Sequence, residues 1–196
     1  MGLLEKLFGS EKRAANPYLE AGCQLIPKIA DLLNLTEWRQ GKLPGYTPQE
    51  VDAINREVDW FQKMADSVAS EQVPGSEMLF HPEAIDPVQR MCVATALEDL
   101  AGSGWRYSFD EEKLPENWKS DVSTYMKSWV CSPNPIVLLE MAELLARAGH
   151  KGEARKALQV VLLFPTYGHD YYCGREGTEQ LVNDIVEDAQ KGLRNL

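Results

Sequence analysis

The chain has 196 residues, of which 44% are hydrophobic, and this is enough for one compact domain with its own core. Its formal net charge of -10 disfavours a nucleic-acid partner, because phosphate groups would meet a field of the same sign. No apolar run approaches the roughly 20 residues that a membrane span needs, and the first ten residues lack the pattern of a secretory signal, so we expect a cytoplasmic protein.

Residues 1–15 are predicted to form an N-terminal amphipathic tail, in which a short apolar turn precedes a polar segment. Its apolar residues are Leu3, Leu4, Leu7 and Phe8. So short a helix buries little area, which is typical of a frayed terminus or of a segment that covers its own domain. Contact with a membrane surface through residues 1–8 is the alternative interpretation.

Residues 16–196 are predicted to form a single all-helical domain, whose first helix starts at Asn16 and Pro17. Asn is a preferred N-cap, and Pro is favoured at the first helical position. Apolar residues then recur at spacings of three and four as far as Leu33. Pro27 cannot donate an amide hydrogen bond to the preceding turn, so we expect a kink or two short helices there.

A second helix is predicted from Thr47 to about Ser70, because Thr47 and Glu50 have the spacing of a capping box. The apolar side of this helix consists of Val51, Ile54, Val58, Phe61, Ala65 and Val68. We expect that side to be buried against the rest of the domain.

A third helix is predicted to start at Asp86 and to end at Gly102, where a glycine-rich stretch begins. Its expected buried side consists of Val88, Met91, Cys92, Thr95, Ala96, Leu97 and Leu100. A fourth helix is predicted from Trp118 to Val130. Its apolar side consists of Val122, Tyr125, Met126 and Trp129.

Two helices joined by a short turn are predicted between Pro135 and Phe164, and each has one apolar stripe. The first stripe consists of Leu138, Met141, Ala142, Leu145 and Ala148, and the second of Ala154, Ala157, Leu158, Val161 and Leu162. Gly149, in the turn between the helices, can adopt the positive φ of a helix C′ position. We therefore expect the two stripes to pack against each other in an antiparallel hairpin.

This hairpin, residues 135–166, resembles a tetratricopeptide repeat (TPR), a two-helix unit that stacks into a superhelix. With Gly149 at the turn glycine of the family, Ala142 and Ala154 fall on the small positions of its two helices. Leu138 stands where the family usually has tryptophan. The resemblance implies an all-α fold of antiparallel helical hairpins, stacked as a short TPR-like α-solenoid or an irregular helical bundle. It also implies a groove that binds peptides or partner proteins.

The last helix is predicted over residues 175–195, and its polar outer side is typical of the end of a stacked array. The loop before it holds His169, Asp170 and Cys173, an imidazole, a carboxylate and a thiol within five residues. Such a group can activate the thiol or bind a small metal ion, so an enzyme or a small-molecule or metal binder is the alternative function. No familiar catalytic motif surrounds it, and tight packing beside the last helix is the other interpretation.

We expect no cofactor and no metal, because the four cysteines never form a C-x-x-C pair and the three histidines are scattered. The strongest candidate for a binding site is a groove lined by aromatic side chains. These are Trp105, Tyr107, Trp118, Tyr125 and Trp129. Acidic residues 110–112 would border the groove and favour a basic partner, while core packing is the alternative for at least half of the aromatics. The sequence therefore predicts an adaptor or scaffold that binds a protein or peptide and has no catalytic activity.

Overall fold

The computed structural model describes residues 16–41, 44–70, 82–102, 114–171 and 177–196. This part of the chain consists of helices and connections without a strand, which confirms the predicted all-α fold. The helices are α2 (Pro17–Leu33), the 3-10 helix η1 (Thr36–Gly41), α3 (Pro48–Ser70), α4 (Pro82–Gly102), α5 (Trp118–Cys131), α6 (Pro135–Arg147), α7 (Lys151–Val161), α8 (Pro165–Tyr171) and α9 (Thr178–Asn195). Within the described residues, no helix has the length and apolar character needed to cross a membrane.

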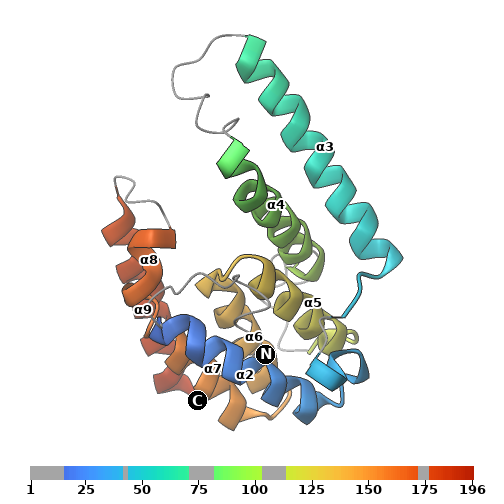
Figure 1. Ribbon diagram of the computed structural model, residues 1–196. Helices are drawn as coiled ribbons and strands as arrows, with labels where there is room; N and C mark the ends of the chain where they lie inside the picture. The colour runs from blue at the N-terminus through green and yellow to red at the C-terminus, as the bar shows by residue number, and fades with distance from the viewer. Residues whose placement is uncertain (1–15, 42–43, 71–81, 103–113, 172–176) are drawn as a thin grey trace.

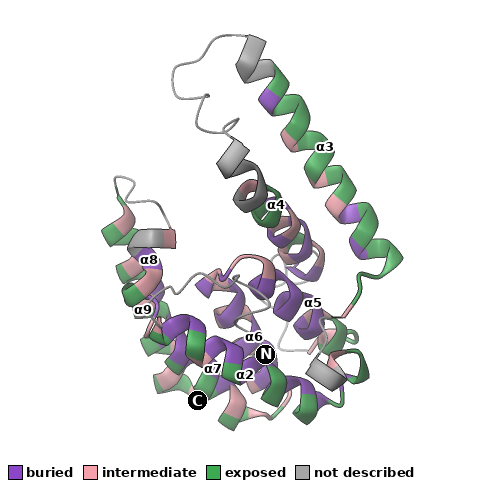
Figure 2. Cartoon of the chain, viewed as in Figure 1, coloured by how far each residue is buried: buried purple, intermediate pink, exposed green. Residues whose placement is uncertain are grey.

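Helices that follow one another in the chain pack side by side from α3 to α7, and α2 and α9 both pack against α7. In Figure 1, α2 and α5 to α9 form a body, from which α3 and α4 project together. We call the α3–α4 pair the hairpin arm. Buried residues are concentrated in the body, whereas most of α3 is exposed (Figure 2).

Helix α2 starts as predicted, because the Asn16 side chain accepts hydrogen bonds from the amides of Tyr18 and Leu19 at 3.0 and 3.4 Å. It ends at Leu33 and is capped by Asn34, which adopts the left-handed conformation with a φ of 57°. The helix is continuous through Pro27, so the alternative of two short helices is wrong. Its apolar side is buried before and after the proline, and this packing holds the helix together where one backbone hydrogen bond is missing.

The predicted hairpin of α6 and α7 is confirmed. Gly149 has a φ of +86°, and the amide of His150 donates to the carbonyl of Leu145 at 2.8 Å, which closes the end of α6. The buried members of the two stripes are Leu138, Met141, Ala142, Leu145, Ala154, Ala157, Leu158 and Val161. Helix α9 covers α7 through the buried residues Ile185 and Ala189 and leaves its polar side to solvent, as predicted.

An aromatic cluster joins α2 to the body. Trp129 Nε1 donates a hydrogen bond to Tyr18 Oη at 3.0 Å, and Tyr18 Oη donates to the carbonyl of Pro133 at 2.9 Å. The Tyr18 ring meets Trp129 and Phe164 edge-on, with ring centroids 6.0 and 5.2 Å away. Gly22 of α2 lies directly against the Trp129 ring and leaves no space for a side chain. The contact between α2 and α5 therefore depends on this glycine.

The hairpin arm differs from the prediction. Val51 and Val58 on α3 and Met91 on α4 were expected to be buried, but all three are exposed. Helix α3 packs mainly against one neighbour, α4, so only a narrow side of it is covered. A stripe as wide as the predicted one needs two neighbouring helices to bury it.

Candidate functional site

The aromatic residues of α5 do not line a groove. Tyr125 is 1% exposed and Trp129 is 0% exposed. Helices α4, α6 and α2 pack around α5, and every residue from Val122 to Val130 is buried. The predicted groove is therefore wrong for Tyr125 and Trp129, which are core residues.

Trp118 is half-buried at the start of α5. The centroid of its ring lies 5.8 Å from that of His150, in the turn between α6 and α7, and Lys119 Nζ lies 5.7 Å from the Trp118 centroid. Trp118 thus stabilises the junction between α5 and the α6–α7 hairpin. Trp105 and Tyr107 lie outside the described residues, and their part in a binding groove stays a prediction.

At the alternative site, the backbone conformation differs from the prediction. His169 and Asp170 were expected in a loop, but they belong to helix α8, which starts at Pro165, a residue favoured at the first helical position. Cys173 lies outside the described residues. Whether the three side chains act together as an enzyme site or a ligand site stays a prediction.

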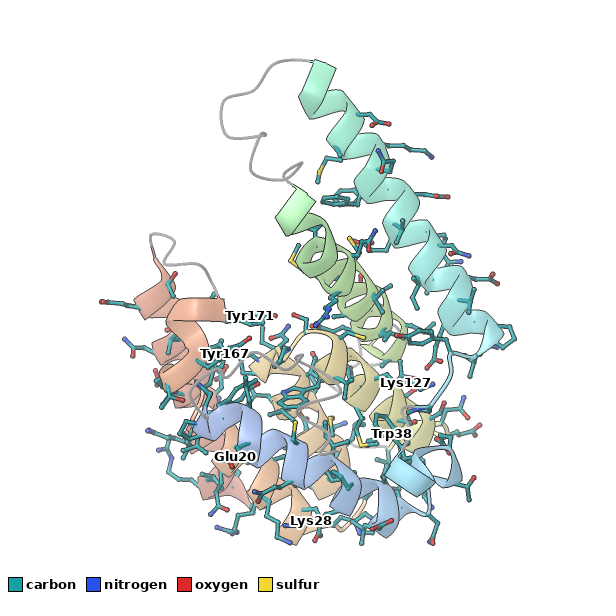
Figure 3. The ribbon with its side chains drawn as sticks, in the orientation of Figure 1. Glu20, Lys28, Trp38, Lys127, Tyr167 and Tyr171 are labelled. Atoms are coloured by element: carbon teal, nitrogen blue, oxygen red, sulfur yellow. The ribbon has the colours of Figure 1, made fainter. Side chains whose placement is uncertain are left out.

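A buried ion pair fixes the base of the hairpin arm to the body. Glu50 is 2% exposed, and its carboxylate accepts hydrogen bonds from Lys127 Nζ at 2.7 and 2.9 Å. Thr124 Oγ1 also donates to this carboxylate, at 2.9 Å, and the amide of Thr47 donates at 2.7 Å, which completes the predicted capping box. Lys127 extends from α5 beside the start of α3 (Figure 3).

The charge state of Glu50 follows from these partners. Burial by itself would raise the pKa of its carboxyl group. The hydrogen bonds from Lys127, Thr47 and Thr124, together with the positive charge of Lys127, outweigh burial and lower the pKa below its ordinary value of 4.5. Glu50 is therefore ionised at neutral pH, and the pair is a charged link between α3 and α5.

A pocket of about 360 Å³ lies beside this ion pair. It is bounded by the start of α3, the end of α4 and residues 115–124, and Glu50, Glu116 and Asp121 give it an acidic lining. Burial raises the pKa of Asp121 to about 6. Such a lining favours a polar or cationic group, but among the described residues no three His, Cys, Asp or Glu side chains are arranged to hold a metal ion.

Among the described residues of the hairpin arm, the largest exposed apolar side chains are Trp60 and Met64 of α3 and Met91 of α4. Trp60 is 57% exposed, Met91 is 49% exposed and Met64 is 37% exposed. Trp60 and Met64 are four residues apart, so they are neighbours on one side of α3. An exposed tryptophan beside exposed methionines is typical of an interaction surface, since these side chains bury a large area on contact.

Met91 of α4 lies on the same side of the arm as this pair. Burial and the nearby charge of Asp99 raise the pKa of Glu57, and burial and the charge of Glu57 raise the pKa of Cys92, so these residues lie where α3 and α4 are close to each other. Around the axis of α3, Trp60 lies about 60° from Glu57, and around the axis of α4, Met91 lies about 100° from Cys92. Because the two helices run in opposite directions, these two rotations place Trp60 and Met91 on the same side of the arm. We call Trp60, Met64 and Met91 the apolar surface of the arm.

The sequence held a signal for this surface that periodicity alone did not reveal. Trp60 and Met64 lie beside the predicted stripe of α3, not in it. Two large apolar residues at a spacing of four beside an already complete stripe widen it beyond what one neighbouring helix covers.

Comparison with protein-family models, with curated proteins and with solved structures finds no match for this chain.

Proposed function

We propose that the chain is a cytoplasmic adaptor or scaffold that binds a protein or peptide partner through the hairpin arm and carries out no reaction of its own. The observation behind this proposal is the exposure of Trp60 next to Met64 and Met91. Tryptophan and methionine are enriched in the centres of protein interfaces and depleted from surfaces that meet only water. Methionine also adapts its shape to a partner at little cost.

The attachment of the arm supports this proposal. A binding surface needs a rigid base, and the buried Glu50–Lys127 pair connects the first turn of α3 to the central helix α5. The serial packing of α3 to α7 accords with a TPR-like array, whose stacked helices present an extended surface to a partner. The resemblance and the surface thus favour the same class of function.

The proposal predicts that the apolar surface determines which proteins the chain captures. The full chain and a Trp60→Ser, Met64→Ser, Met91→Ser variant would be immobilised and exposed to extract from the native cells. We expect the variant to lose the proteins that the unmodified chain retains, because truncating central interface residues costs about 2 kcal/mol or more each.

A second variant controls for loss of exposed apolar area in general. Leu32→Ser with Leu181→Ser removes two exposed leucines from α2 and α9, far from the arm in sequence. This control should capture the same proteins as the unmodified chain, and circular dichroism should be equal for all three. Recovery of the same proteins by the arm variant would contradict the proposal.

A further inference from the structure

The methionines of the described residues fall into two classes. Met64 and Met91 are 37% and 49% exposed, and both belong to the apolar surface of the arm. Met126 and Met141 are fully buried in the body. An oxidant dissolved in water reaches exposed thioethers first, so the two methionines of the arm are the accessible pair in this part of the chain.

The thiols of the described residues compete poorly for an oxidant. Cys23 and Cys92 are buried, and Cys131 is half-buried, with the Oη of Tyr46 3.6 Å from its Sγ. Burial raises the pKa of Cys23 to about 11, and burial also raises the pKa of Cys92 and of Cys131. Because the thiolate reacts with peroxides and the thiol does not, these cysteines are almost entirely in the unreactive form at neutral pH.

We propose that Met64 and Met91 are a modification site at which a hydroperoxide oxidises both thioethers and so weakens the apolar surface of the arm. The consequence for partner binding rests on the proposed function. In each reaction the sulfur attacks one oxygen of the peroxide, an S–O bond forms and the O–O bond breaks. The sulfur loses two electrons, and the second oxygen takes the proton of the attacked oxygen and leaves as water, or as an alcohol from an organic hydroperoxide.

The positions of the two methionines confine the effect to the surface. A sulfoxide is polar and is costly to bury without hydrogen bonds, so it opposes the apolar contact that the thioether favours. The body keeps its packing, because its own methionines are fully buried. Methionine sulfoxide reductases convert each sulfoxide back to the thioether, so the loss of the surface is reversible.

Limited oxidation of the full chain tests the site itself. The protein would be treated with dilute hydrogen peroxide at neutral pH, and the products would be located by peptide mass spectrometry. We expect most of Met64 and Met91 to be sulfoxide before about a tenth of the three described thiols is oxidised. Oxidation of those thiols ahead of the two methionines would overturn the proposal.

Retention on a phenyl column measures the effect on the surface without a known partner. The reference is the Trp60→Ser, Met64→Ser, Met91→Ser variant. We expect oxidation of the unmodified chain to remove at least about half of the retention that this variant lacks, because two of its three apolar groups become polar. Methionine sulfoxide reductases should restore the retention, and circular dichroism should stay the same throughout.

Met64→Leu with Met91→Leu is the matched control. Leucine is apolar and similar in volume but has no sulfur, so this variant should keep its retention after the same treatment. The comparison also accounts for oxidation at Met1, Met78 and Cys173, which both proteins carry.

Three results separate the modification from the proposed function. Equal loss of retention in the leucine control, or loss of helical signal on oxidation, would overturn the modification site. Unchanged retention after oxidation, with retention lost in the serine variant, would overturn the modification and leave the binding surface intact. Equal retention of the serine variant and the unmodified chain would overturn the surface itself.

Discussion

Replacing Gly22 with alanine is expected to destabilise the protein by about 3 kcal/mol or more. The added Cβ would overlap the ring of Trp129, which is fully buried. That ring cannot move aside cheaply, because its Nε1 donates to Tyr18 Oη at 3.0 Å and its edge meets the Tyr18 ring. Either α2 moves away from α5 or the aromatic cluster is rearranged. Urea unfolding followed by circular dichroism measures the loss.

Gly152→Ala is the matched control for this variant. Gly152 lies in α7, and a Cβ there would meet no atom within 4 Å. The control should be unchanged or more stable by up to about 1 kcal/mol, since alanine loses less conformational freedom than glycine when a helix forms. If Gly22→Ala were as stable as Gly152→Ala, the close approach of α2 to α5 would be wrong.

Lys127→Met is expected to destabilise the protein by about 3–5 kcal/mol at neutral pH, because it leaves the Glu50 carboxylate buried without its cation. Glu50→Gln added to Lys127→Met should restore part of the loss, since no charge is then buried. Lys156→Met is the control. Its ion pair with Glu153 is on the surface, and the expected loss is under about 1 kcal/mol.

The pH dependence of stability gives a second test of the Glu50–Lys127 ion pair. The folded pKa of Glu50 is lowered below 4.5, so the pair contributes its full stability above the unfolded pKa and loses it as pH falls through the folded value. In Lys127→Met the remaining carboxyl group takes up a proton more easily, so the deficit relative to the unmodified protein should shrink as pH falls below about 5. A deficit that stays constant from pH 7 to pH 4 would contradict the role of Glu50.

Local patterns in the sequence were sufficient to predict most of the helices. The α6–α7 hairpin follows from two apolar stripes and Gly149, and the start of α3 follows from the Thr47–Glu50 capping box. The second role of Glu50 could not be predicted. Its partner Lys127 is 77 residues away in the chain, and only the packing of α3, α4 and α5 brings the two together.

The candidate site was harder to predict, because periodicity reports one apolar side and not how many helices surround it. Tyr125 and Trp129 lie on a stripe like that of a surface helix, yet α5 is central, and its small polar residues Ser123 and Ser128 are buried too. Conversely, Trp60 is exposed because α3 packs mainly on α4. Both differences depend on the number of neighbours of a helix, which is a property of the assembled fold.

Oxidation of methionines by dilute hydrogen peroxide tests most directly whether the apolar surface of the arm is uncovered in the free protein. Met64 and Met91 are exposed on the arm, whereas Met126 and Met141 are fully buried in the body and serve as controls within the same molecule. Peptide mass spectrometry should show Met64 and Met91 converted to sulfoxide at least about tenfold faster than Met126 and Met141. Met64 and Met91 reacting as slowly as the two buried methionines would contradict the account.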